Sequence, residues 1–161
     1  MTDGEKLAYL AGLVDGEGTV SIRRVHNRAK SASGGKIYYA VEIRVFNTDR
    51  KMIDWISQNF RGSVWTTNRK DGKHKPCYIW MCSGIEENLN LMKSIVPFMI
   101  TKRQLVECAI PLLEKQREGF GMRKRFFDEI SAAGEIAMKE VLRLKLLGTH
   151  RGIRNPAEKE I

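Results

Sequence analysis

Two acidic residues, Asp15 and Glu17, stand at the end of an apolar, glycine-containing segment that reads LAGLVDGEG. The residues before them predict a helix that begins at a capping box of Thr2 and Glu5 and ends at Val14 or Asp15. Carboxylates at the C-terminal end of a helix meet the negative end of its dipole, and a second copy beside them would add like-charge repulsion. A bound divalent cation would relieve that repulsion, so this segment is the first candidate for metal-dependent chemistry.

A stripe of small residues, Ala8, Gly12 and Gly16, follows the same helix at intervals of four. Residues at this spacing share one helix face, and each glycine costs roughly 1 kcal/mol of helix propensity. That cost is explained if the backbone of another helix must approach closely, which is a steric argument. The alternative is an ordinary amphipathic helix that ends in a glycine cap at Gly16 or Gly18. The segment occurs once in the chain, so we expect the stripe to form a dimer interface between two copies.

Composition favours a polyanionic partner. The 161 residues suit one domain, and 28 basic against 19 acidic residues give a net charge of +9. An anionic membrane surface is the competing partner, but the basic residues fall mostly in strand-like and loop segments rather than along one amphipathic helix. We therefore expect nucleic acid and no membrane association.

Targeting signals and cysteine usage point to the inside of a cell. The N-terminus is acidic and shows no apolar secretory segment, and no apolar run approaches the ~20 residues that span a bilayer. The three cysteines lack metal-ligand spacing, which favours reduced thiols and disfavours a zinc site. The expected location is intracellular: the cytoplasm in a prokaryote, or an organelle if the gene is organellar.

Hydrophobic periodicity predicts two β-hairpins set between helices. Period-two alternation marks residues 19–25 and 36–45 as one long hairpin and residues 63–69 and 77–82 as a second. Between them, Asn47-Thr48-Asp49 supplies N-cap chemistry for a helix that ends at Gly62. Helices are also expected at 86–95, from a cap at Thr101 onward, and at 126–147. The order is α-β-β-α-β-β-α, followed by extra helices.

The LAGLVDGEG segment resembles the signature of the LAGLIDADG homing endonucleases in its single-copy form. The resemblance covers about residues 5–115. It implies an α+β fold of αββαββα order with a four-stranded antiparallel DNA-binding saddle, extended here by C-terminal helices at about 122–147 and a loose tail at 148–161. We expect one domain over residues 1–161.

The same resemblance implies an activity and its partners. Single-motif members act as homodimers that hydrolyse phosphodiesters in both strands of double-stranded DNA, at a long, near-palindromic site. They use Mg²⁺, for which Mn²⁺ can substitute, and no small-molecule cofactor. Many are encoded in introns and promote intron homing. Two alternatives keep the same basic surface: an RNA-binding intron maturase and a DNA-binding regulator that does not cut.

Catalytic residues can be carried over position by position. The resemblance makes Glu17 the metal ligand, where many relatives have Asp, and makes the Gly16 carbonyl its backbone companion. It places Lys102, which follows Pro97 and Phe98, near the scissile phosphate; the alternative is a surface lysine at a helix start. Asn47 matches a water-positioning residue, although it fits a helix N-cap equally well.

The polar face of the hairpins is expected to contact DNA, because a two-stranded ribbon fits the major groove. In the first hairpin, Glu42 suits a cytosine amino group or an ion pair with Arg23 or Arg44. In the second hairpin, a one-residue slip would exchange the two faces, so the register stays open. The predicted DNA-binding residues are Ser21, Arg23, Asn27, Tyr38, Glu42, Arg44, Thr66, Asn68, Arg69, Lys70, Lys73 and Lys75.

Overall fold

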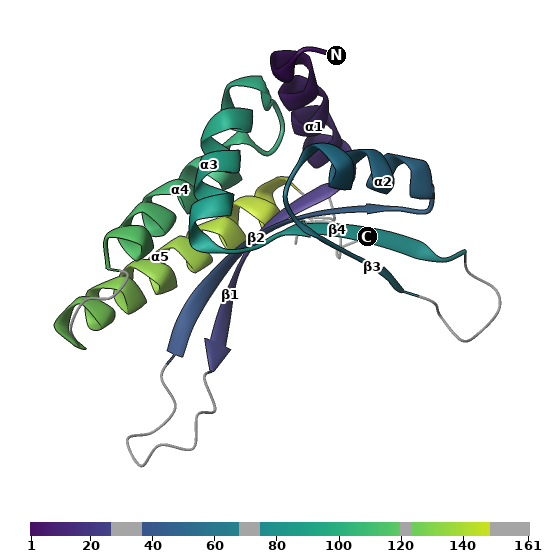
Figure 1. Cartoon of the computed structure of the whole chain (residues 1–161). Helices are drawn as coiled ribbons and strands as arrows, with labels where there is room; N and C mark the ends of the chain where they lie inside the picture. Colours follow the sequence, from purple (N-terminus) through teal and green to yellow (C-terminus); the bar gives the residue numbers. More distant parts are fainter. Residues whose placement is uncertain (27–36, 68–74, 120–123, 149–161) are drawn as a thin grey trace, which may run out of the picture.

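A computed structural model describes residues 1–26, 37–67, 75–119 and 124–148. In this part of the chain a four-stranded antiparallel sheet is covered by helices on one face, as predicted (Figure 1). The elements are, in chain order, α1 (Asp3–Glu17), β1 (Gly18–His26), β2 (Ile37–Asn47), α2 (Arg50–Asn59), β3 (Ser63–Thr67), β4 (Cys77–Cys82), α3 (Ile85–Ile95), the short 3-10 helix η1 (Val96–Phe98), α4 (Arg103–Glu118) and α5 (Lys124–Gly148).

Helix α1 leads directly into the first strand. The predicted capping box of Thr2 and Glu5 is present, and the helix continues to Glu17, slightly beyond the predicted end. Gly18 caps it at the point where the chain turns into β1. A Cβ atom there would lie 2.6 Å from the Cα atom of Val14 and 3.1 Å from the carbonyl oxygen of Arg44. Only glycine therefore lets the end of α1 and the β1–β2 hairpin meet this closely.

Strand order β1-β2-β4-β3 gives the sheet two distinct faces. The odd-numbered residues of β2 from Tyr39 to Val45 are buried under the helices, whereas the even-numbered ones lie on the opposite face. Figure 1 shows the two hairpins bending away from the helices on either side, so the uncovered face is concave. This is the saddle that the resemblance implied.

The second hairpin is joined to the core through Trp80. Its side chain is fully buried on the helix side of β4. Gly62 precedes β3, and a Cβ atom at that position would lie 2.4 Å from the indole Nε1 of Trp80. Gly62 thus permits close packing against the indole; the helix before it is already capped at Phe60.

Helix α5 packs against both α4 and the first hairpin. Gly134 lies over the ring of Tyr39, where a Cβ atom would be 2.2 Å from Cδ2, and the hydroxyl of Tyr39 donates a hydrogen bond to Glu135. The long C-terminal helix is therefore part of the core and reaches back to β1 and β2. None of the helices in the described segments is long and apolar enough to cross a membrane.

Candidate functional site

Asp15 fastens the end of α1 to the start of α4. Its carboxylate accepts hydrogen bonds from the backbone N–H groups of Ile100 (2.6 Å), Thr101 (3.2 Å) and Lys102 (2.9 Å). Burial opposes the charge, but these N–H donors outweigh it and hold the pKa of Asp15 below its ordinary value. The predicted cap at Thr101 is wrong, because Lys102 is the N-cap of α4 and makes no side-chain cap hydrogen bond. Asp15 instead binds the N–H groups of the three residues that precede the helix.

We expect Asp15→Ala to lower the free energy of unfolding by roughly 2 kcal/mol at pH 7, because several N–H groups lose a charged acceptor. The pKa of Asp15 is lower in the folded protein than in the unfolded chain. Its contribution is therefore complete above the unfolded value, near 3.9, and is lost as the pH falls through the folded value. Urea unfolding at pH 7 and at low pH measures this difference. Asp128→Ala, an exposed site on α5, is the control, and an equal effect of both variants would contradict the anchoring role.

Lys102 lies half-buried against the last turn of α1, which does not fit the surface-lysine alternative. Its Nζ atom donates hydrogen bonds to the carbonyl oxygens of Val14 (2.9 Å) and Asp15 (2.6 Å). These carbonyls form the negative end of the α1 dipole. Burial lowers the pKa of the Lys102 ammonium, and the negative charges of Asp15 and Glu17 counteract part of that shift. The structure therefore brings Lys102 into the electrostatic field of both motif acids.

Glu17 is the last residue of α1, and its side chain is exposed. Among the described residues it has no ion-pair or hydrogen-bond partner, in contrast to Asp15. A free carboxylate next to the exposed Gly16 is a hard oxygen donor of the kind that Mg²⁺ and Mn²⁺ prefer. No group of three acidic, histidine or cysteine side chains in the described segments is arranged to hold a metal ion. Glu17 could supply one oxygen ligand to such an ion.

The small-residue stripe of α1 faces away from the core. Ala8, Gly12 and Gly16 are all exposed, and a Cβ atom at Gly12 or Gly16 would meet nothing within 4 Å among the residues that the structure describes. Packing within one protomer therefore gives no reason for glycine at these positions. The face is open to a partner helix, and it ends at Glu17.

The concave face of the first hairpin carries an ion cluster around a buried glutamate. Strand pairing places Ser21 opposite Glu42, which is only 3% exposed. Arg23 donates from Nε to Glu42 at 3.0 Å, and Arg44 donates to the same carboxylate. Burial alone would raise the pKa of Glu42, but the two arginines outweigh it and lower the pKa. The sequence suggests either a cytosine contact or an ion pair for Glu42, and the ion pair, with both Arg23 and Arg44, is present in this structure.

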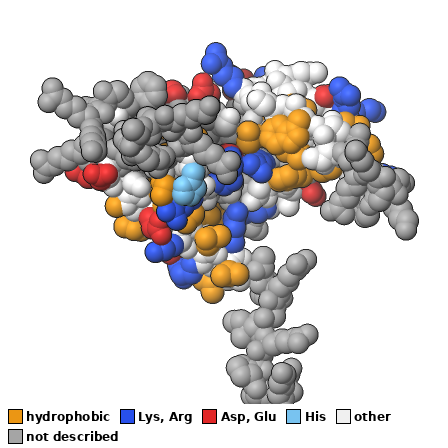
Figure 2. Space-filling model, turned by 90° about the horizontal axis from the view of Figure 1, so that it is seen from below, with side chains coloured by type: hydrophobic (Ala, Val, Ile, Leu, Met, Phe, Trp, Pro, Cys, Tyr) orange, Lys and Arg blue, Asp and Glu red, His pale blue; other side chains and the backbone are white. Residues whose placement is uncertain are grey.

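Basic and aromatic side chains share this face. Figure 2 shows blue Lys and Arg side chains gathered through its middle, beside orange hydrophobic ones. Tyr38 and Arg23 are exposed here, while Ser21 and Arg44 are half-exposed. The face therefore combines positive charge, hydrogen-bond donors and a flat ring in one concave surface.

Strand pairing fixes the register that the sequence leaves open. Arg44 pairs with Met81, which pairs with Ser63, so Trp65 and Thr67 follow on the concave face. Thr66 pairs with Tyr78, so its side chain lies on the opposite face of the sheet from Arg44, and its predicted DNA contact stays a prediction. Lys75 is exposed just before β4. The predicted residues Asn27, Asn68, Arg69, Lys70 and Lys73 lie outside the described residues.

Asn47 takes part in a local turn. Its Oδ1 atom accepts a hydrogen bond from the backbone N–H of Asp49 at 2.7 Å. Asp49 is the N-cap of α2 and accepts from the N–H of Lys51 at 2.9 Å. The predicted capping chemistry is therefore present, with Asp49 rather than Asn47 at the cap position.

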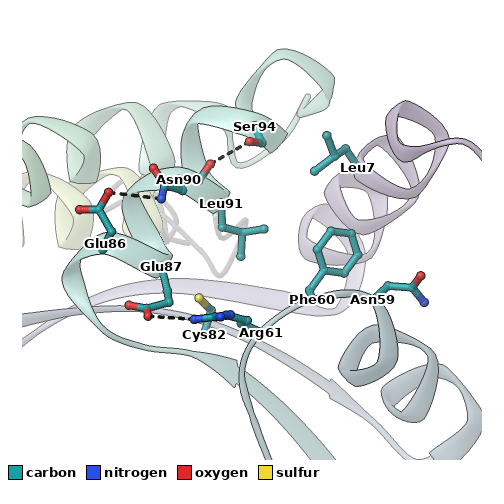
Figure 3. A pocket seen from close by; sticks show the side chains of 10 residues that line it. All are labelled: Leu7, Asn59, Phe60, Arg61, Cys82, Glu86, Glu87, Asn90, Leu91 and Ser94. Atoms are coloured by element: carbon teal, nitrogen blue, oxygen red, sulfur yellow. Dashed lines mark hydrogen bonds and ion pairs between the residues drawn. The ribbon is translucent and has the colours of Figure 1, made fainter.

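Two of the hollows among the described residues differ in where they lie. One, of about 390 Å³, lies on the helix side between α1, the end of α2 and α3, and is lined by Leu7, Phe60 and Leu91 (Figure 3). The ion pair of Arg61 with Glu87, 3.9 Å apart, closes one side of it. The other, of about 580 Å³, lies beside Lys102 and is also lined by Lys145, a residue that sequence reasoning missed. A lysine at the end of a long helix gives no sequence signal that separates it from surface charge.

Comparison with known proteins assigns the family. The profile described as "LAGLIDADG endonuclease" matches residues 10–106, more than half of the chain. No curated protein matches the sequence.

Solved structures share the fold at low sequence identity. The homing endonuclease I-CvuI, in complex with the I-CreI target, is 19% identical with a TM-score of 0.68, and the alignment covers 88% of this chain and 83% of that one. The archaeal intron-encoded homing endonuclease I-Vdi141I, complexed with DNA, is 14% identical with a TM-score of 0.56, over 88% and 98% of the two chains. The group I intron-encoded I-CeuI, also complexed with DNA, is 17% identical with a TM-score of 0.54, over 74% and 58%. With the LAGLVDGEG segment at the end of α1 and the saddle-shaped sheet beneath it, the chain belongs to the LAGLIDADG endonuclease family.

Proposed function

We propose that this protein is a homodimeric, metal-dependent endonuclease, encoded in an intron, that cuts double-stranded DNA at a long, near-palindromic site. The observation that carries the proposal is the exposed carboxylate of Glu17, whose negative charge acts on Lys102 and which ends an open small-residue helix face. A two-fold dimer through Ala8, Gly12 and Gly16 would bring two copies of this arrangement together. Two cleavage centres related by the two-fold axis would allow the dimer to cut both strands.

Glu17 and the Gly16 carbonyl would hold the divalent cation, Mg²⁺ or Mn²⁺. When bound, the metal neutralises phosphate charge and increases the acidity of a coordinated water. The fit rests on the donor set, since Glu17 is free of any partner in the described part of this chain, whereas Asp15 is fully engaged. Glu17 is therefore the motif acid that remains available to a ligand.

The remaining chemistry falls to residues around Glu17. Lys102 places a positive charge that would stabilise the negative charge developing on the phosphate during attack. Asp15 positions Lys102 through the backbone of residues 100–102, so it acts indirectly. Asn47 would orient water through its amide nitrogen, because its oxygen already accepts a hydrogen bond from Asp49.

The concave face would bind the DNA. Arg23, Tyr38, Arg44 and Ser21 lie on one ribbon of the kind that enters a major groove. Because Glu42 already accepts from two arginines, we propose that it orients their guanidinium groups toward bases or phosphates rather than reading a base alone. We also propose DNA contacts for Asn27, Asn68, Arg69, Lys70, Lys73 and Lys75, which belong to the segments that join the strands of the two hairpins.

DNA affinity should fall steeply with salt, because a chain of net charge +9 displaces counterions from phosphates. For six to ten phosphate contacts, the association constant should fall by about 10³-fold or more between roughly 50 and 200 mM NaCl. Fluorescence anisotropy with a labelled duplex measures this dependence. An association constant that did not change with salt would contradict the prediction that the partner is a polyanion.

Cleavage of a supercoiled plasmid library of candidate sites, with Mg²⁺ and with EDTA, tests the function directly. A discrete linear product that forms only with Mg²⁺ supports the proposed endonuclease. Tight binding without scission, on a library shown to contain a bound site, would instead favour a DNA-binding regulator. Preferential binding of intron RNA would favour a maturase.

A further inference from the structure

The end of α5 brings a second ammonium group to the region of Lys102. The Nζ atom of Lys145 lies 3.1 Å from the hydroxyl oxygen of Thr19, two residues beyond Glu17. Figure 1 shows this yellow end of α5 next to the start of β1. The C-terminal extension of the fold therefore delivers a half-buried cation to the neighbourhood of the motif.

Lys102 and Lys145 line one cavity of about 580 Å³. Its other polar lining residues are Thr19, Thr101 and Gln104, and the rest are leucines, so the lining holds two cations and no carboxylate among the described residues. Hydroxyl and amide groups beside paired ammonium groups form a donor-rich surface, which suits a tetrahedral oxyanion. The leucines would limit access of water to it.

Neither ammonium group has its charge balanced by a described carboxylate inside this cavity. Burial lowers the pKa of Lys145, and the positive charge of Lys102 lowers it further. The motif acids Asp15 and Glu17 lie outside the cavity lining, and their negative charges offset only part of the effect of burial on the pKa of Lys102. Two half-buried cations held together in this way are unfavourable for the protein alone, and an anion between them would relieve the repulsion.

We propose that Lys145, together with Lys102, binds a backbone phosphate of the DNA at or next to the bond that is cut. This inference rests on the proposed endonuclease function and assigns the C-terminal helix a direct part in the site. The hydrogen bond between Lys145 and Thr19 holds the ammonium group at the cavity, which both residues line. Lys145 would thus hold the phosphate in place while Lys102 stabilises its charge.

The test compares Lys145→Met, which keeps an unbranched apolar side chain and removes the charge, with Lys139→Met. Lys139 lies on the same helix but is exposed and pairs with Glu135, so it controls for the removal of one positive charge. Binding is measured by anisotropy on a pool of random 30-bp duplexes across a salt series with Ca²⁺. Single-turnover cleavage is measured with Mg²⁺ on the site recovered from the plasmid library.

The salt slope is the slope of the logarithm of the association constant against the logarithm of the salt concentration, and we expect Lys145→Met to reduce its magnitude by about 0.9 for each phosphate that the protein no longer neutralises. The same variant should slow cleavage by about tenfold or more. Lys139→Met should change neither, and Lys145→Arg should restore most of the slope. Equal slopes and rates for the Met variants would overturn the role of Lys145 while leaving the endonuclease intact. If Lys145→Met abolished only dimerisation, with its slope unchanged, the proposal would also fail. If the wild-type protein binds DNA without cutting it, the proposed endonuclease function fails. The phosphate contact of Lys145 can still be tested in that case, because the salt slope of binding does not depend on cleavage.

Discussion

Glu17→Gln is expected to slow DNA cleavage by about 1000-fold or more while leaving DNA affinity in Ca²⁺ or EDTA nearly unchanged. Glutamine has almost the shape of glutamate but lacks the charge that binds a divalent cation. Glu17 is exposed and makes no ion pair or hydrogen bond within the described residues, so the fold does not depend on its charge. Single-turnover cleavage with Mg²⁺, together with anisotropy on the same duplex, separates the two effects.

Glu107→Gln is the matched control for this experiment. Glu107 is also an exposed glutamate within a helix, but it belongs to α4 and is not part of the motif. We expect Glu107→Gln to cleave DNA at the wild-type rate. That result would exclude a general effect of raising the net charge by one unit. If Glu17→Gln cut DNA as fast as this control, Glu17 would not be a metal ligand and the carried-over assignment would be wrong.

The elements that the sequence predicts well are those with strong local patterns. Alternation from Tyr39 to Val45 decides which face of β2 is buried, and it assigns Arg44 to the opposite face without further information. Turn residues and caps bracket most of the helices, so the order of elements follows from local chemistry. The motif at Asp15 and Glu17 then places the acids at a helix end.

What the sequence does not predict depends on contacts between distant segments. Asp15 binds the N–H groups of residues 100–102, and no local sequence pattern connects it to them. The local sequence therefore suggests Thr101 as the cap of α4, because threonine is a common N-cap residue. Local alternation leaves the face of Thr66 open because the register of β3 depends on its pairing with β4. Lys145 carries no signal of its own because only the packing of α5 on the first hairpin brings it to Thr19.

Gly12→Leu is expected to weaken dimerisation by about 100-fold or more while leaving the protomer folded. Overpacking a tight helix contact costs roughly 1–3 kcal/mol, and two-fold symmetry introduces the leucine on both sides. A tenfold change in affinity corresponds to about 1.4 kcal/mol. Two costs from the middle of that range therefore weaken the dimer affinity by more than about 100-fold. Sedimentation velocity over a concentration series measures the dimer directly.

The fold of the protomer should tolerate this leucine, which makes the experiment decisive. A Cβ atom at Gly12 meets nothing within 4 Å in the described part of one chain, and replacing glycine in a helix gains roughly 1 kcal/mol of propensity. Thermal unfolding of Gly12→Leu should therefore stay near that of Ala132→Leu, a control at an exposed small residue on α5. A folded monomer that binds one half-site weakly and no longer cuts both strands would place the dimer axis along Ala8, Gly12 and Gly16. A dimer that survives the leucine would move that axis elsewhere, and with it the reason for two Glu17 carboxylates to meet.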